Sequence, residues 1–171
     1  LSLLRESSET REMRLSKFDL VEILQDLVET VNYEISDGCE PIALQAQAPL
    51  SLEADRELLW RVFENLLRNA LIHSGNAGGI RIIANERDGK QLEVRIVDSG
   101  PGIEEAKLNR IFEPFFRVDE ARNRDTGGHG LGLAIAASAV RRHNGSITAS
   151  NRKEGGLEVH VVIPRSQDSS A

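Results

Sequence analysis

The chain has 171 residues, enough for one domain with a buried core, and its 40% hydrophobic and 28% charged residues form an ordinary soluble mixture. Its net charge of −6 argues against a nucleic-acid partner, because general nucleic-acid binders usually carry a basic excess. The single cysteine, Cys39, excludes an internal disulfide and a cysteine-based zinc cluster and is compatible with a reducing cytoplasm. No apolar run approaches the ~18–20 residues that a membrane span needs.

The two ends of the chain differ in composition from its middle. Residues 1–16 are highly charged with leucines mainly at the front, which is typical of the end of a longer helix followed by a linker. The chain begins at Leu1 rather than Met, so we expect an excised piece of a longer protein. We therefore predict a helix tail and linker over 1–17, one domain over 18–164, and a disordered tail over 165–171.

Two helices with a strand between them are predicted in the first half. Asp19 has the position of an N-cap, and aliphatic residues follow it at helical spacing as far as a stop signal at Asp37-Gly38. Alternating apolar and polar residues over 41–49 predict a half-buried strand. A second helix, capped by Asp55, is expected to run to about His73.

The second half is predicted to consist mainly of strands in hairpins. The expected elements are strands over 80–85, 92–97, 146–150 and 157–163, a short helix over 104–111, and a helix over about 131–143. The sum is three main helices and about five strands. This predicts an α+β fold, a two-layer sandwich in which a mixed, mostly antiparallel sheet is covered on one face by helices.

The segment ENLLRNALIHS places two amides on one face of the second helix. Asn65 and Asn69 are four residues apart, and Ile72 lies on the same face, opposite the apolar stripe. Two amides presented together suit a hard cation or phosphate oxygens. The alternative is a solvated polar face with a Glu64–Arg68 ion pair.

The segment Asp98-Ser99-Gly100-Pro101-Gly102 directly follows a predicted strand. Gly100 and Gly102 allow backbone torsions or close ligand approach that a Cβ would block. The Asp98 carboxylate, at the strand end, is placed to accept a hydrogen bond from an adenine amino group. A plain turn is the alternative, since this sequence also favours one.

The segment GGHGLGL, residues 127–133, opens a helix and offers bare backbone N–H groups for phosphates. A Walker A loop is excluded, because the only Gly-Lys pair, Gly89-Lys90, is followed by Gln91. A Rossmann fingerprint is excluded because the segment follows a charged loop rather than a strand. A flexible hinge is the alternative.

The segment FEPFFR, residues 112–117, holds three of the five phenylalanines. The rings are expected to anchor a mobile segment, or simply to form a hydrophobic staple, while Arg117 is a natural γ-phosphate ligand. The four histidines have no metal-ligand spacing. We interpret His143 as a charged cap at a helix end and His160 as a structural residue in a strand.

In order and spacing, these four segments resemble the N, G1, F and G2 boxes of the sensor histidine kinases. ENLLRNALIHS resembles the N box, VDSGPGI the G1 box, IFEPFFR the F box and GGHGLGLAI the G2 box. The resemblance covers roughly Phe18 to Pro164, and its second half is especially similar to envelope-stress sensors of the EnvZ/CpxA type. It implies the Bergerat ATP-binding fold shared with gyrase, Hsp90 and MutL, with an ATP lid over about 103–130.

The resemblance also implies ATP and Mg²⁺ as cofactors and a role for each box residue. Glu64 would act as a base or orient the attacking imidazole, and Arg117 would reach the γ-phosphate. Asp98 would bind the adenine amino group, while Asn65 and Asn69 would organise Mg²⁺ through the nucleotide phosphates. The implied nucleotide-binding residues are Asn65, Asn69, Asp98, Gly100, Gly102, Gly128, His129, Gly130, Leu131, Gly132 and Leu133.

The chain departs from the family pattern at three positions. Ile72 stands where many members carry Lys or Arg, and Arg68 and Arg122 are candidates to compensate. His73 and His129 occupy positions often held by Tyr and by Thr or Ser. These departures concern the catalytic rate rather than nucleotide binding.

None of the four histidines has the sequence context of a phosphoacceptor, so the acceptor is expected upstream in dimerisation helices. The implied function is the ATP-binding kinase domain of a two-component sensor, which phosphorylates that histidine for relay to a response-regulator aspartate. We expect a homodimeric parent, a monomeric fragment, and a cytoplasmic domain of an inner-membrane sensor. Two alternatives stay open: a non-catalytic nucleotide-gated interaction module and a serine-directed kinase of the same fold.

Overall fold

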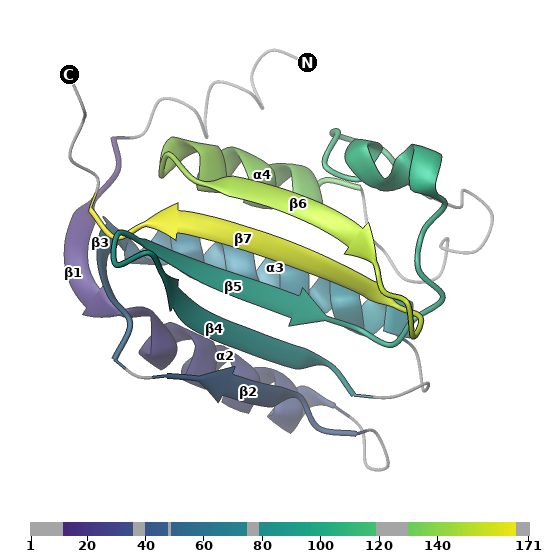
Figure 1. Ribbon diagram of the computed structural model, residues 1–171, viewed down its shortest axis with the longest axis horizontal. Helices are drawn as coiled ribbons and strands as arrows, with labels where there is room; N and C mark the ends of the chain where they lie inside the picture. The colour runs from purple at the N-terminus through teal and green to yellow at the C-terminus, as the bar shows by residue number, and fades with distance from the viewer. Residues whose placement is uncertain (1–11, 36–39, 48, 75–78, 119–129, 167–171) are drawn as a thin grey trace.

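The computed structural model describes residues 12–35, 40–47, 49–74, 79–118 and 130–166. A five-stranded sheet forms one layer and the helices lie behind it (Figure 1). The strands are, in sheet order, β2 (Ala43–Ala46), β4 (Arg81–Arg87), β5 (Gln91–Val97), β7 (Leu157–Pro164) and β6 (Ser146–Asn151). The helices are α2 (Leu20–Glu34), α3 (Arg56–Ser74), α4 (Gly132–Arg142) and the 3₁₀ helix η1 (Glu105–Arg110). The predicted α+β sandwich is confirmed.

The sheet is mixed and mostly antiparallel, as expected. β2 pairs with β4 in parallel, and the three other neighbouring pairs are antiparallel. The turn between β4 and β5 passes through Asp88 and Gly89, both at positive φ (56° and 68°). Glycine enters this left-handed region without steric cost and aspartate more easily than most residues, which explains the hairpin at this point.

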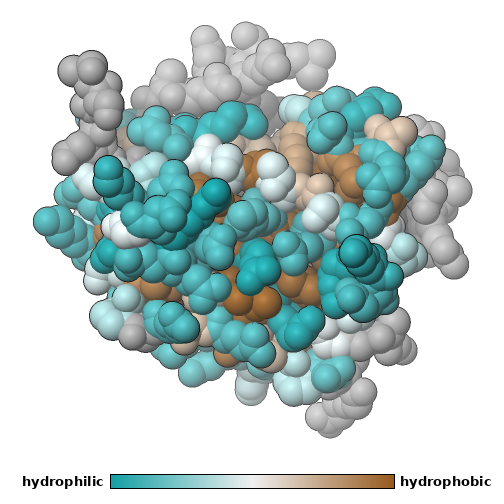
Figure 2. Space-filling view, in the orientation of Figure 1, coloured by the Kyte–Doolittle hydropathy of each residue, from teal (hydrophilic) through white to brown (hydrophobic). Residues whose placement is uncertain are grey.

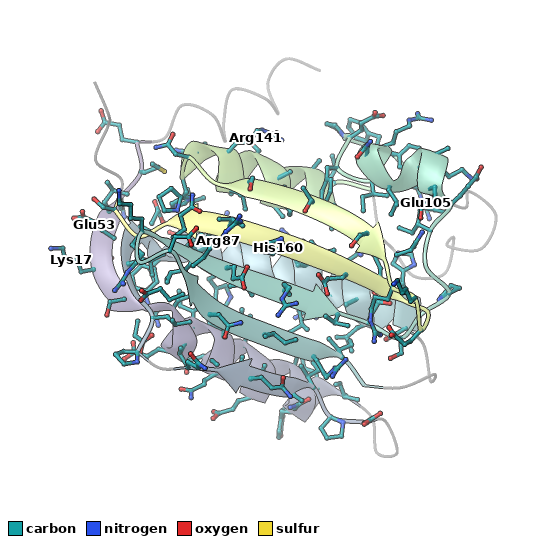
Figure 3. All side chains as sticks on the ribbon, viewed as in Figure 1. Lys17, Glu53, Arg87, Glu105, Arg141 and His160 are labelled. Atoms are coloured by element: carbon teal, nitrogen blue, oxygen red, sulfur yellow. The ribbon has the colours of Figure 1, made fainter. Side chains whose placement is uncertain are left out.

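The two faces of the sheet have opposite characters. Along β5, Leu92, Val94 and Ile96 are buried against the helices, while Glu93 and Arg95 alternate with them on the other face. That other face is largely hydrophilic (Figure 2). His160 of β7 lies on it, with Nε2 3.1 Å from Oε2 of Glu93 (Figure 3), so its predicted place in a strand is confirmed. In the described ranges, no helix is both long and apolar enough to cross a bilayer.

Side-chain caps fix the starts of the first two helices. Asp19 Oδ1 accepts hydrogen bonds from the backbone N–H of Val21 (3.0 Å) and of Leu50 (2.9 Å). Asp55 Oδ1 accepts one from Leu58 N–H at 3.1 Å. Both predicted caps are confirmed, and each satisfies donors that a helix start leaves without an intrahelical partner.

The N-terminal boundary differs from the prediction. Residues 15–17, which the sequence assigned to a linker, belong to β1 (Leu15–Asp19). This strand pairs antiparallel with β3 (Ser51–Asp55), a second strand that the sequence did not predict. β1 buries little of its surface, so its composition resembles that of a linker, and its pairing partner lies more than thirty residues away. Residues 1–11, the expected helix tail, lie outside the described residues.

His143 is buried and neutral, which corrects its interpretation as a charged helix cap. Its Nδ1 lies 2.7 Å from the Ala139 carbonyl oxygen, and its Nε2 accepts a hydrogen bond from Asp55 N–H at 3.1 Å. Burial lowers the pKa of His143 below its ordinary value of 6.5. The imidazole therefore joins the end of α4 to the start of α3 through two specific hydrogen bonds rather than through charge.

Candidate nucleotide site

A cavity of about 400 Å³ lies between α3 on one side and the segments around η1 and the start of α4 on the other. We call its α3 side the helix wall; the residues are Asn65, Arg68, Asn69, Ile72 and His73. We call the opposite side the lid wall; the residues are Ile103, Ile111, Phe116, Arg117, Val118, Gly130, Leu131, Gly132, Leu133 and Ile135. All four sequence boxes thus contribute to one cavity, the G1 box through Ile103.

The helix wall follows from the helical period of α3. Leu59, Phe63 and Leu66 are buried in the core beneath the helix. Asn65 and Asn69, four residues apart, point from another face of the helix and both line the cavity. The structure therefore brings the two amides together as the spacing predicted.

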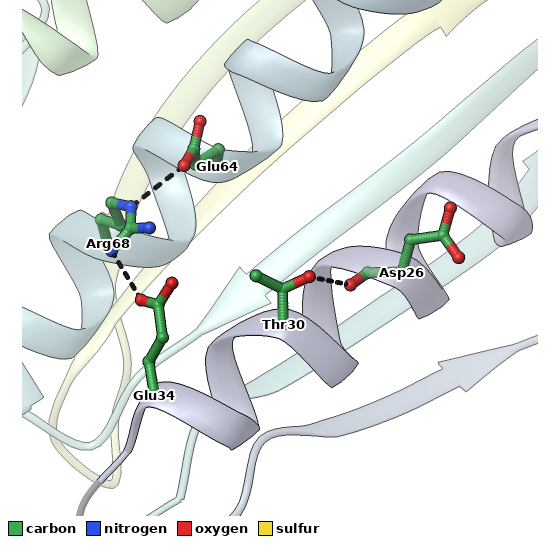
Figure 4. A network of polar contacts seen from close by, with 5 residues as sticks. All are labelled: Asp26, Thr30, Glu34, Glu64 and Arg68. Carbon is green, nitrogen blue, oxygen red and sulfur yellow. Dashed lines mark hydrogen bonds and ion pairs between the residues drawn. The ribbon is translucent and has the colours of Figure 1, made fainter.

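Glu64 is placed differently from its neighbours. It is absent from the cavity walls formed by the described residues, and its Oε1 lies 3.2 Å from Nε of Arg68. Arg68 Nη1 also lies 3.1 Å from Oε2 of Glu34, on α2 (Figure 4). The two hydrogen bonds raise the pKa of Arg68, and the bond to Glu34 contributes more than the bond to Glu64. The predicted Glu64–Arg68 ion pair is formed, and Glu34 is a third member that was not predicted from the sequence.

Asp98 is buried at the end of β5, and one of its carboxylate oxygens is committed to backbone donors. Oδ1 accepts hydrogen bonds from Gly100 N–H at 2.9 Å and Leu157 N–H at 3.1 Å. A Cβ on Gly100 would lie 2.6 Å from the His73 carbonyl oxygen, so only glycine fits there. The predicted turn is therefore formed, and the role of the Asp98 carboxylate toward adenine stays a prediction.

Gly156 is a close-packing residue that sequence reasoning missed. A Cβ at this position would lie 2.0 Å from the Asp98 carbonyl oxygen, and its φ is +91°. The β6–β7 turn is thereby pressed against the backbone of Asp98. Sequence patterns could not reveal this contact, because it joins segments far apart in the chain.

Asn151, at the end of β6, fixes the start of the lid wall. Its Oδ1 accepts a hydrogen bond from Ile103 N–H at 2.8 Å, and its Nδ2 donates to the Ile103 carbonyl oxygen and to Glu105 Oε1. Gly102, at φ +76°, lies against the same amide, since a Cβ there would be 2.7 Å from Asn151 Oδ1. The sequence contained no signal for Asn151 beyond a polar residue at a strand end.

The start of α4 closes the cavity beside α3. Gly130, at φ +68°, accepts a hydrogen bond at its carbonyl oxygen from Phe115 N–H at 3.0 Å. A Cβ at Gly132 would come within 3.3 Å of Asn65 Oδ1, which shows how closely the two walls approach. Leu131 and Leu133 line the cavity as well. Gly128 and His129 lie outside the described residues.

The aromatic segment has two packed rings and one exposed ring. Phe112 and Phe116 pack against the core, and Phe116 also lines the cavity. The Arg110 guanidinium lies 4.5 Å from the centroid of the Phe116 ring, a cation–π contact. Phe115 is 62% exposed and has a φ of 64°. Two of the three rings thus anchor the segment to the core, and Arg117 lines the cavity.

The cavity combines features that suit a ligand with an apolar part and an anionic part. Isoleucine and leucine side chains occupy both walls, and the walls also carry the guanidinium groups of Arg68 and Arg117 and the amides of Asn65 and Asn69. Within the described part of the chain, no group of three or more His, Cys, Asp or Glu is arranged to hold a metal ion.

Residues 54–167 match the family of histidine kinase-, DNA gyrase B-, and HSP90-like ATPases. Because this match covers more than half of the chain, the chain belongs to that ATPase family. The fold, the paired amides and the glycine segments around the cavity agree with this assignment.

Two curated relatives are sensor kinases of Escherichia coli K12. The signal transduction histidine-protein kinase BaeS is 39% identical over 129 residues, which is 74% of this chain and 27% of BaeS. The sensor histidine kinase CpxA is 37% identical over 116 residues, which is 68% of this chain and 25% of CpxA. The chain thus spans about a quarter of the length of these relatives.

Solved structures agree with the fold. The catalytic domain of histidine kinase ThkA superposes with a TM-score of 0.81 at 28% identity, covering 91% of this chain and 99% of that domain. Full-length ShkA in complex with AMPPNP gives a TM-score of 0.79 at 27% identity, covering 94% of this chain and 33% of ShkA.

Proposed function

We propose that this chain is the ATP-binding kinase domain of a two-component sensor histidine kinase. It transfers the γ-phosphoryl group of ATP to a histidine in an upstream dimerisation domain, for relay to a response-regulator aspartate. The observation that carries the proposal is the single cavity formed by the amides of α3, the Arg117 segment and the glycines before α4. The AMPPNP complex of ShkA supports the nucleotide, and a complex of ThkA with the response regulator TrrA supports the relay partner.

The adenine is assigned to Asp98 and the phosphates to the cavity walls. Two backbone N–H groups hold Asp98 Oδ1, and we assign Oδ2, to which none of the described residues donates a hydrogen bond, to the exocyclic amino group. Gly100 and Gly102 keep the backbone close to the base. Backbone N–H groups of residues 128–133 and the Arg117 guanidinium then bind the phosphates.

The amides of Asn65 and Asn69 fit Mg²⁺ held through a nucleotide. Both line the cavity, and amide oxygens are hard ligands of the kind Mg²⁺ prefers. Phosphate oxygens and water would supply further ligands to the ion. Bound Mg²⁺ would neutralise phosphate charge, which is the main requirement of phosphoryl transfer besides positioning.

Glu64 is assigned the role of a base or of a residue that orients the attacking imidazole. Arg68 holds its carboxylate at a fixed place on α3, next to Asn65, and outside the described cavity walls. That location suits contact with an incoming histidine of another domain better than contact with ATP. We further propose a homodimeric parent and a cytoplasmic position for this domain in an inner-membrane sensor.

The test is phosphotransfer in trans. The chain is mixed with [γ-³²P]ATP, Mg²⁺ and a separately prepared helical domain that carries the acceptor histidine. We expect label on that domain that is lost in acid, as for phosphohistidine, and no label when its histidine is replaced by alanine. Intact ATP binding without any transfer at saturating ATP contradicts the proposal, and acid-stable label would indicate a serine kinase instead.

A second candidate function is a nucleotide-gated interaction module without catalysis, which Ile72 favours. This residue lines the cavity, is 46% exposed, and supplies no charge to the phosphates. Glu64→Gln in the full-length parent separates the two functions, because a kinase loses autophosphorylation while a module shows none before or after the change.

A further inference from the structure

The helix wall has one strongly basic side chain. Among the described residues of the cavity, the arginines are Arg68 on the helix wall and Arg117 on the lid wall, and no lysine is present. Ile72, about one helical turn beyond Arg68, contributes apolar surface only. A triphosphate held between the two walls therefore meets a guanidinium on the α3 side only at Arg68.

The Arg68 guanidinium is held by two carboxylates on two different helices. Nε bonds to Glu64 Oε1 at 3.2 Å on the same helix, and Nη1 bonds to Glu34 Oε2 at 3.1 Å on α2 (Figure 4). Guanidinium has five N–H donors in one plane. Nη2 carries two of them, and no described residue accepts a hydrogen bond from it.

This arrangement fixes the plane of the Arg68 guanidinium and leaves the two N–H donors of Nη2 without an acceptor among the described residues. The three side chains are between a third and a half exposed, so each ion pair contributes mainly orientation and little stability. A guanidinium whose plane is already set loses less rotational freedom when it binds an anion. Arg68 can keep both carboxylates and still donate two hydrogen bonds from Nη2 to phosphate oxygens.

We infer that Arg68 is a phosphate ligand on the helix wall and that Glu34 is its positioning residue. The inference rests on the proposed ATP-binding function and adds two residues to it. Glu34 lies outside the family match, which begins at residue 54. Its assignment rests on the hydrogen bond that joins α2 to α3.

The experiment measures the affinity of the folded chain for ATP, ADP and adenosine by calorimetry. We expect Arg68→Ala to weaken ATP binding roughly tenfold or more, because a charge-assisted hydrogen bond is lost, and to change adenosine binding less than about twofold. Arg61→Ala is the matched control. Arg61 forms a similar i,i+4 pair with Glu57 on α3, at 2.7 Å, but is not among the cavity residues, so ATP binding should be unchanged.

Two results overturn the role of Arg68: ATP affinity that is unchanged, or ATP and adenosine affinities that fall equally. If the unmodified chain binds adenosine and ATP equally well, phosphate recognition as a whole is wrong. If it binds none of the ligands, the proposed function fails and this inference fails with it.

Glu34 is tested by Glu34→Gln alone and together with Arg68→Ala. Glu34→Gln alone should weaken ATP binding about two- to threefold, because the guanidinium is no longer held in place. In the Arg68→Ala background, Glu34→Gln should cause no further weakening. Glu29→Gln, which removes the same charge from an exposed position of α2, should have no effect. An equal effect of Glu34→Gln in both backgrounds, or tighter binding in both, overturns the positioning role.

Discussion

The two walls of the cavity are built in different ways. The helix wall is a local structure: once α3 forms and buries its apolar stripe, Asn65, Arg68 and Asn69 are placed by the helical period. The lid wall depends on contacts between distant segments, such as Asn151 with Ile103 and Gly130 with Phe115. A substitution in the helix wall should therefore lower ligand affinity directly. A substitution in the lid wall should first loosen the local structure and lower ligand affinity as a consequence.

The largest expected effect is at Asp98, which lies at the fixed end of β5. Asp98→Asn keeps an oxygen for Gly100 and Leu157 but turns an NH₂ group toward the adenine amino group. We expect ATP and adenosine affinities to fall together by roughly 10- to 100-fold, with the fold retained. GTP, which has a carbonyl at that position, should gain affinity relative to ATP. Competition binding with both nucleotides measures this, and an unchanged preference would remove Asp98 from the adenine site.

An intermediate effect is expected at the lid anchor. Asn151→Ala removes the partners of both backbone groups of Ile103. Amide hydrogen exchange at residues 103–105 should increase, and ATP affinity should fall severalfold, while the unfolding free energy falls by only about 1–2 kcal/mol. Ser150→Ala, on the exposed side of the same strand, is the control. Equal exchange in the two variants would show that the start of the lid wall is held by other contacts.

The smallest effect concerns His143, which joins the end of α4 to the start of α3. Because its pKa is lowered in the folded chain, the unfolded chain binds the proton first as the pH falls through 6.5. The unfolding free energy should therefore decrease from pH 7 toward pH 5, and the loss should end once the pH falls below the folded pKa. Urea titrations across this range should show that His143→Gln reduces the dependence of the unfolding free energy on pH. An identical dependence in the two proteins would contradict the buried neutral imidazole.

The same contrast explains how much the sequence could predict. Periodicity and caps gave α2, α3, the strands of the main sheet and the grouping of Asn65 with Asn69, because each depends on residues near one another in the chain. The pairing of β1 with β3 and the packing of Gly156 on Asp98 depend on segments that only the fold brings together. The prediction for His143 was wrong because its position at a helix end suggested charge. Its hydrogen bond with the backbone of Asp55, eighty-eight residues away, appears only in the fold.

The central claim is that a nucleotide binds between the helix wall and the lid wall. Calorimetric titration of the chain with a non-hydrolysable ATP analogue, with and without Mg²⁺, tests it most directly. We predict one saturable site per chain, tighter binding when Mg²⁺ is present, and an affinity lowered by roughly 10- to 100-fold in Asp98→Asn. A folded chain that shows no saturable binding, or one whose binding is unchanged by Asp98→Asn, would contradict it.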